Sequence, residues 1–221
     1  MCGITAISAN KEALPFLLQG LEKLEYRGYD SAGITTIEGN HLFTKKAKGR
    51  LQNLKDLLKD ENVLGHVGIG HTRWATHGIP SNLNSHPHTN NDETISLVHN
   101  GIIENYRELK EILILQGYQF HSETDSEVAA ALLNHYYKGD PKEAIKKTVS
   151  KLKGTFALVI LFEDQPDVIY SIRNVSPIVA TICKEGAMLA SDLTALCRFT
   201  NEYFVVPEYH ILELHKDHVV L

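Results

Sequence analysis

The order in which strands and helices are predicted along the chain constrains its fold more than any other feature. Short β-rich segments come first, three helical segments follow at 106–115, 126–137 and 141–152, and β-rich segments then return. This separation predicts an α+β fold, because an α/β fold would alternate strands and helices. Several strands are apolar on both faces, which is typical of strands buried between two layers.

The boundaries of the other elements follow from the apolar periodicity and from turn residues. Strands are predicted at 3–8, 31–37, 41–47, 67–71, 95–99, 155–162, 168–172, 178–183, 187–190, 203–206 and 211–214. Apolar residues at helical spacing predict helices over 16–24 and 51–58, and Pro15 suits the first turn of the former. No repeat or flexible linker interrupts the chain, so we expect one domain over residues 1–221.

The composition argues against several classes of protein. A net charge of −5 with scattered Lys and Arg does not fit a nucleic-acid surface. The longest apolar run, 156–162, has strand length, far short of the ~20 residues of a membrane span. We expect no signal peptide. Three cysteines, Cys2, Cys183 and Cys197, are too sparse for a disulfide framework and predict a reducing cytoplasm.

Cys2 is the first residue that can carry chemistry. Its small side chain permits removal of Met1, which would place a thiol and a free α-amine on one residue. The amine titrates near ~7.7–8.0 and the thiol near ~8.5, so the amine can accept the thiol proton, directly or through one water. On position alone, a buried cysteine that opens a strand is the simpler interpretation.

Residues 72–94 form a long segment with little periodicity, and such a loop within a compact domain is usually functional. Arg73 can bind a carboxylate through two hydrogen bonds. Trp74, the only tryptophan, is either a core anchor or part of a lid. For an isolated Arg-Trp pair, packing is the simpler interpretation.

Asn100 and Gly101 follow a predicted strand and allow two interpretations. Asn-Gly is the commonest signal of a tight hairpin. Alternatively, a side-chain amide and a backbone N–H at the end of a strand point at one developing negative charge, as in an oxyanion hole.

Histidines are concentrated in the same region and raise the question of a metal ion. They are His71, His77, His86, His88 and His99. They lack helical spacing, and no carboxylate or thiol nearby has clear ligand spacing. We therefore expect no metal, and we expect these histidines to bond to the backbone and to shape the loop.

Three smaller features complete the set of candidates. Arg27 and Asp30 are predicted to form a structural ion pair. Gly28 suits a tight turn or a close backbone approach. Asp125 is either the N-cap or a first-turn residue of the helix beside it, or it binds an ammonium group on a ligand, and capping is the simpler interpretation.

Taken together, these segments resemble the class II glutamine amidotransferases, which belong to the N-terminal-nucleophile hydrolases. The resemblance is carried by Cys2-Gly3-Ile4, Arg27-Gly28-x-Asp30-Ser31-Ala32-Gly33 and His99-Asn100-Gly101. Finer matches at 24–30, 71–78, 86–88 and 101–105 are similar to the branch that makes glucosamine 6-phosphate. The resemblance covers essentially the whole chain and implies a four-layer αββα sandwich of two facing antiparallel sheets.

The resemblance also implies a role for each matching residue. Cys2 is the nucleophile with its amine as the base, and Asn100 and Gly101 form the oxyanion hole. The implied reaction needs no cofactor: the thiolate attacks the side-chain amide of L-glutamine, ammonia leaves, and the thioester is hydrolysed to glutamate.

The remaining residues are implied to bind glutamine or to support the site. Arg73 binds its α-carboxylate and Asp125 its α-ammonium group, while Trp74 lies on a mobile loop that covers the site. Thr76 and His77 line the same pocket. The supporting residues are Arg27, Gly28 and His86.

The sugar-isomerase domains of that branch, which bind fructose 6-phosphate, are absent from this sequence. They are therefore expected partners, in cis or as a separate chain. Two alternatives stay open: a glutaminase that serves another synthase, and a non-catalytic glutamine-sensing or docking module that retains Met1.

Overall fold

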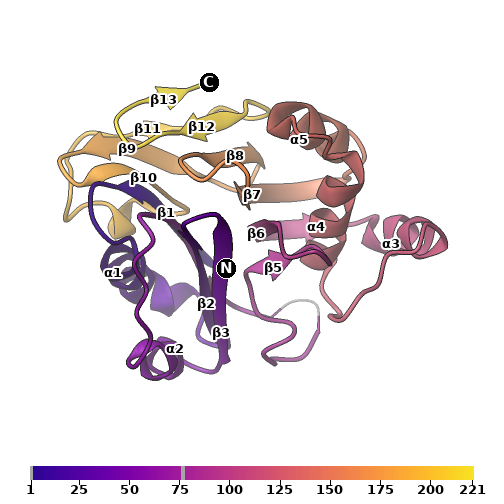
Figure 1. Cartoon of the computed structure of the whole chain (residues 1–221), viewed down its shortest axis with the longest axis horizontal. Coiled ribbons are helices and arrows are strands. Elements are labelled where there is room, and N and C mark those ends of the chain that lie inside the picture. Colours follow the sequence, from indigo (N-terminus) through magenta and orange to yellow (C-terminus); the bar gives the residue numbers. More distant parts are fainter. Residues whose placement is uncertain (1, 76–77) are drawn as a thin grey trace.

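Two antiparallel sheets face each other in the computed structural model, which describes residues 2–75 and 78–221 (Figure 1). Within these residues, one sheet has seven strands in the order β11-β9-β10-β1-β4-β2-β3. The other has six strands in the order β13-β12-β8-β7-β6-β5. In the first sheet, β1 pairs with β10, so strands from the two ends of the described chain lie side by side. The second sheet is built within residues 88–220, and most neighbouring strands in it are consecutive in the sequence.

The elements have the following bounds. The first sheet contains β1 (Gly3–Ala9), β2 (Ser31–Glu38), β3 (His41–Lys48), β4 (Val67–Arg73), β9 (Val179–Cys183), β10 (Gly186–Ala190) and β11 (Phe204–Val205). The second contains β5 (His88–Thr89), β6 (Ile95–Ile103), β7 (Gly154–Phe162), β8 (Ile169–Asn174), β12 (Leu212–Leu214) and β13 (Val219–Val220). The helices are α1 (Leu14–Leu24), η1 (Glu25–Arg27), α2 (Leu51–Leu58), α3 (Tyr106–Leu115), α4 (Asp125–Tyr136), α5 (Pro141–Val149) and η2 (Leu193–Ala195).

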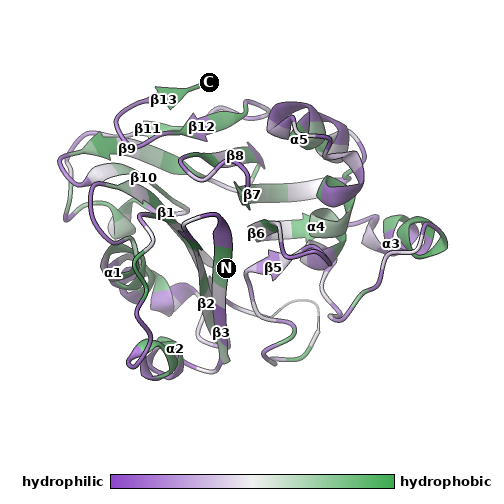
Figure 2. Ribbon diagram, viewed as in Figure 1, coloured by the Kyte–Doolittle hydropathy of each residue, from purple (hydrophilic) through white to green (hydrophobic). Residues whose placement is uncertain are grey.

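Three apolar cores fill the spaces between four layers. The first core joins α1 and α2 to the outer face of the seven-stranded sheet, and the second joins α4 and α5 to the outer face of the six-stranded sheet. The third lies between the sheets and draws on β1, β4, β6 and β7. The expected four-layer αββα sandwich is therefore confirmed. Figure 2 shows hydrophobic strands inside and hydrophilic residues on the outer side of α5.

The alternation of side chains along β1 and β6 decides which residues face the space between the sheets. In β1, Ile4 and Ala6 enter the core between the sheets, whereas Ile7 packs against the helices. Because successive side chains of a strand point to opposite faces, Cys2 continues the row of Ile4 and Ala6. In β6, Val98 is on the inner face, so Asn100 shares that face.

Most predicted elements are present, and the differences are informative. β4 continues to Arg73 and β6 continues to Ile103, beyond the predicted ends at 71 and 99. Asn100 and Gly101 pair with Ala157 and Phe156 of β7, so the hairpin interpretation is wrong. The pairing partner lies far along the sequence, and local turn propensity cannot report it.

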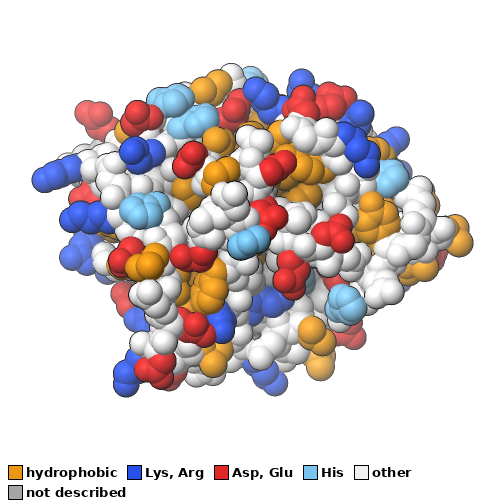
Figure 3. Space-filling view, viewed as in Figure 1, with side chains coloured by type: hydrophobic (Ala, Val, Ile, Leu, Met, Phe, Trp, Pro, Cys, Tyr) orange, Lys and Arg blue, Asp and Glu red, His pale blue; other side chains and the backbone are white. Residues whose placement is uncertain are grey.

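On the face drawn in Figure 3, Lys and Arg side chains are interspersed with Asp and Glu. No helix in the described part of the chain is both long enough and apolar enough to cross a membrane.

Helix α2 provides a test of the core between the helices α1 and α2 and the seven-stranded sheet. Leu54 is fully buried, whereas Leu57 on the same helix is 52% exposed. Leu54→Ala should lower the free energy of unfolding by about 2–5 kcal/mol, because it removes buried methyl groups and leaves a cavity. The matched variant Leu57→Ala should change it by less than about 0.5 kcal/mol. Urea unfolding measures both, and equal losses would contradict the assignment of the buried face.

Candidate active site

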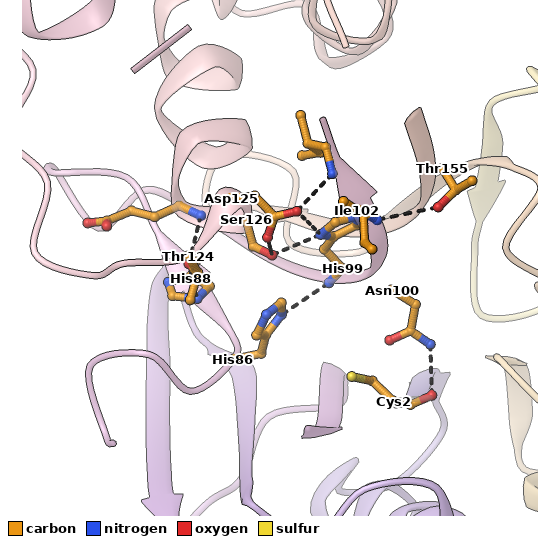
Figure 4. A network of polar contacts seen from close by, with 12 residues as sticks. Cys2, His86, His88, His99, Asn100, Ile102, Thr124, Asp125, Ser126 and Thr155 are labelled. Carbon is orange, nitrogen blue, oxygen red and sulfur yellow. Dashed lines mark hydrogen bonds and ion pairs between the residues drawn. The ribbon is translucent and has the colours of Figure 1, made fainter. Parts of the chain in front are cut away.

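A cavity of about 320 Å³ opens where the two sheets meet the start of α4. Its lining includes Cys2, which precedes β1, together with residues of β4, of β6 and of the first turn of α4. Figure 4 shows several of these side chains converging on it. The candidate residues in its wall are Cys2, Arg27, Arg73, Trp74, His86, Asn100, Gly101 and Asp125. The structure thus brings together residues that are separated by up to about half the chain.

Cys2 presents its thiol to this cavity. The backbone N–H of Trp74 donates a hydrogen bond to Sγ at 3.2 Å, a contact that stabilises a thiolate. Burial raises the pKa of the Cys2 thiol, although the Trp74 N–H and the positive charge of Arg73 oppose that effect. A thiol with a raised pKa needs a base beside it before it can act as a nucleophile.

Asn100 reaches Cys2 from the opposite sheet. Its Nδ2 donates to the backbone carbonyl of Cys2 at 2.9 Å, as Figure 4 shows. Gly101 has φ +136°, and a Cβ at this position would lie 2.1 Å from the carbonyl oxygen of Thr155. Only glycine satisfies both constraints, so the backbone next to Asn100 approaches β7 in a way that no other residue permits.

Arg73 lies at the end of β4 and is buried in the cavity wall. Its Nη2 donates to the carbonyl of Gly78 at 3.1 Å. Gly28 makes room for this part of the chain, since a Cβ there would lie 2.6 Å from the carbonyl carbon of Arg73. The predicted close backbone approach at Gly28 is therefore present. Trp74 is 46% exposed and meets Tyr29 edge to face at 5.5 Å, so it is not a core anchor.

The prediction that Arg27 pairs with Asp30 is wrong. Arg27 pairs with Asp192, which precedes η2. Asp30 accepts a hydrogen bond from the backbone N–H of Ala75 at 2.8 Å and so holds the chain after Trp74. Asp192 lies far along the sequence, and only the tertiary fold brings it to Arg27.

Asp125 is the first residue of α4, not its cap. Thr124 is the N-cap, and its side chain accepts from the backbone N–H of Glu127. The Oδ2 of Asp125 accepts from the backbone N–H of Ile103 at 2.8 Å. The capping interpretation of Asp125 is therefore wrong, and its placement in the first turn is confirmed. Its buried carboxylate lines the same cavity as Cys2.

Buried histidines form a network beside the cavity, and two of them, His86 and His99, line its wall. His71 and His86 stack with ring centroids 4.1 Å apart. His86 accepts through Nδ1 from the backbone N–H of His99, and His88 bonds to the hydroxyl of Thr124. These bonds agree with the expected role of shaping the loop. Among the described residues, no three His, Cys, Asp or Glu side chains are grouped to hold a metal.

Two candidates cannot be placed, and several lining residues were not expected. Thr76 and His77 lie outside the described residues. The unexpected lining residues are Ile102, Thr124, Ser126, Thr155, Ser176, Pro177 and Ser191. Ser191 accepts from the backbone N–H of Ile4 at 2.9 Å and so holds the start of β1. No local sequence signal distinguishes these residues.

The chain is similar over most or all of its length to known proteins of one kind. Residues 71–198 match the family model of the glutamine amidotransferase domain. The chain is 48% identical over its full length to the glutamine–fructose-6-phosphate aminotransferase (isomerising) of Clostridium tetani, and 44% identical to that of Thermococcus kodakarensis. It spans 36% of the former and 37% of the latter, so it is about a third as long as these relatives.

Solved structures agree with the fold. The glutamine phosphoribosylpyrophosphate amidotransferase of Bacillus subtilis superposes with a TM-score of 0.86 at 27% identity, covering 99% of this chain and 48% of that one. A glutamine aminotransferase class II domain protein from Silicibacter pomeroyi gives a TM-score of 0.68 at 14% identity, covering 99% of this chain and 97% of that one. The second likeness concerns the fold alone.

The buried histidines predict a loss of stability in mild acid. Burial lowers the pKa of His71 to about 3, and it lowers the pKa values of His86 and His88 well below their ordinary value. As the pH falls, the unfolded chain therefore binds protons first. The free energy of unfolding should decrease below pH ~6.5 and down toward pH ~3, by up to about 1.4 kcal/mol per pH unit for each histidine.

Urea unfolding at several pH values measures this slope. The variant His88→Gln should reduce this slope by the contribution of one proton, up to about 1.4 kcal/mol per pH unit, because glutamine does not titrate. A His88→Gln slope equal to that of the unmodified protein would contradict the neutral buried state.

Proposed function

Because the chain belongs to the glutamine amidotransferase family, we propose that it hydrolyses L-glutamine to glutamate and ammonia with Cys2 as the nucleophile. The observation that carries this proposal is the convergence on one cavity of the Cys2 thiol, the Trp74 N–H, the Asn100 amide, and one buried charge of each sign. A thiol, a donor for a developing oxyanion and paired charges for an amino acid are what this reaction requires.

The first step needs a base for the thiol. Removal of Met1 frees the α-amine of Cys2, which accepts the thiol proton directly or through one water. The thiolate then attacks the side-chain amide carbon of glutamine. The carbonyl oxygen becomes an oxyanion, and the donors for it are the Asn100 amide and the backbone N–H of Gly101.

The second half of the reaction returns the thiol. The protonated amine donates its proton to the leaving nitrogen, and ammonia departs to leave a thioester on Sγ. Water attacks the thioester and releases glutamate. The Asn100 amide already bonds to the Cys2 carbonyl without substrate, and such preorganisation of a donor lowers the barrier.

Recognition of glutamine rests on complementary charge. Arg73 binds the α-carboxylate and Asp125 binds the α-ammonium group, because each is a buried charge in the cavity wall. Trp74 stands half exposed at the rim and belongs to the loop proposed to close over the site. Thr76 and His77 complete the pocket in this proposal.

The ammonia is proposed to serve the synthesis of glucosamine 6-phosphate from fructose 6-phosphate. The relatives are named as fructose-6-phosphate aminotransferases and are about three times as long as this chain. Sugar-isomerase domains, in cis or as a separate chain, would bind the acceptor in the cytoplasm. The test is to supply such a partner and to identify the aminated product. Its identity distinguishes fructose 6-phosphate from the acceptor of another synthase.

Cys2→Ala should abolish glutamine hydrolysis and leave the fold intact, because it removes the nucleophile and little volume. Glutamate release, measured beside thermal unfolding, tests both parts. The matched control is Cys197→Ala, since Cys197 is exposed and lies outside the cavity, and it should retain full activity. Hydrolysis by purified Cys2→Ala would exclude the mechanism, and intact mass should show that active protein lacks Met1.

Arg73→Ala and Asp125→Ala should each lower kcat/KM for glutamine by about 10- to 100-fold, since each leaves a substrate charge buried without its partner. The same pairing predicts discrimination among amides. Propionamide lacks both α-groups and should be hydrolysed far more slowly than glutamine by the unmodified protein. Equal rates on the two amides would rule out this mode of recognition.

A further inference from the structure

His71 makes a contact that the proposed mechanism has not used. It lies in β4 on the face between the sheets and is fully buried. Its Nε2 lies 3.1 Å from the backbone carbonyl oxygen of His99 and 3.0 Å from Oδ1 of Asn100. His71 thus touches the residue whose amide faces Cys2.

These two contacts decide which nitrogen of His71 carries the proton. A backbone carbonyl can only accept a hydrogen bond, so Nε2 must be the donor in its contact with His99. The other ring nitrogen, Nδ1, is buried and has no hydrogen-bond partner in the described structure. A bare lone pair suits that position better than a buried N–H without an acceptor. The ring is therefore the neutral tautomer with its hydrogen on Nε2.

The tautomer in turn decides the orientation of the Asn100 amide. Because Nε2 donates, the atom of Asn100 that faces His71 must be the carbonyl oxygen Oδ1. The NH2 group is then on the other side, where Nδ2 donates to the Cys2 carbonyl at 2.9 Å. An amide NH2 carries two hydrogens, so the second remains for the oxyanion.

We propose that His71 is a positioning residue for glutamine hydrolysis, which holds the Asn100 amide with its NH2 group toward Cys2. This inference rests on the proposed function. The single Nε2–H of His71 donates to both the carbonyl oxygen of His99 and Oδ1 of Asn100. Without His71, only the bond from Nδ2 to the Cys2 carbonyl holds the orientation of the amide. A flipped amide would turn its oxygen toward the developing oxyanion and repel it.

The surroundings keep His71 in this state. Burial lowers its pKa to about 3, and the positive charge of Arg73 acts in the same direction. The ring of His86 stacks on it at 4.1 Å and restricts its rotation. His71 therefore does not serve as a proton carrier near neutral pH, and its contribution is orientation alone.

The test is a double-mutant cycle between His71 and Asn100, with glutamine hydrolysis as the readout. His71→Phe keeps a ring of similar size against His86 but removes the donor. His71→Gln places an amide NH2 at about the reach of Nε2, so it can donate to both acceptors. Both variants are made in the unmodified chain and in the Asn100→Ala background, and thermal unfolding identifies any that fail to fold.

We expect His71→Phe to lower kcat with little change in KM, approaching the ~10²–10³-fold loss expected for Asn100→Ala. His71→Gln should recover most of the lost rate. In the Asn100→Ala background, His71→Phe should cost less than about twofold more, because the two residues act as one unit. Losses that multiply in the double variant, or a His71→Gln variant as slow as His71→Phe, would overturn the proposal.

A measurement on the unmodified protein keeps the proposal testable even if a variant does not fold. The nitrogen chemical shifts of His71 in a ¹⁵N-labelled sample should show a neutral ring protonated at Nε2. A proton on Nδ1, or a charged ring near neutral pH, would overturn the proposal. Neither result depends on turnover. By contrast, hydrolysis that survives Cys2→Ala would defeat the proposed function itself.

Discussion

The packing of two sheets face to face is the constraint on which the site depends. The apolar layer between them sets the distance between β1 and β6, and the alternation of side chains then turns Cys2 and Asn100 toward each other. The hydrogen bond from Asn100 Nδ2 to the Cys2 carbonyl joins the sheets at this point. A shift of either strand by one residue would move its side chain to the other face and dismantle the site.

Beside this junction lies a buried polar network that contains three neutral imidazoles. His71, His86 and His88 are all buried, and desolvation keeps them uncharged. Buried polar groups lower stability unless they are hydrogen-bonded, and each of these rings meets a backbone or side-chain partner. The network orients Asn100 and the start of α4 without adding a charge beside the thiol.

Much of the fold was predictable, and the physical reason differs between helices and strands. The predicted helices at 51–58 and 106–115 match α2 and α3 at both ends, because amphipathic periodicity is a local property. The strands β4 and β6 extend beyond their predicted ends because pairing with distant strands continues through polar residues. The two-residue strands β5 and β13 carry no periodic signal and were not expected.

The sequence alone determined the layered α+β class and the candidate residues, since both rest on local patterns and on motifs that need no coordinates. It left open whether Asn100 and Gly101 form a turn and whether Asp125 caps a helix. Only the tertiary structure decided these points, because the partners of Asn100 and Asp125 come from other elements of the fold. The structure also showed that Arg27 pairs with Asp192 and not with Asp30, and it revealed the contact of His71 with Asn100. Such pairs are separated along the chain and meet only when the elements of the fold pack together, so no local pattern can encode them.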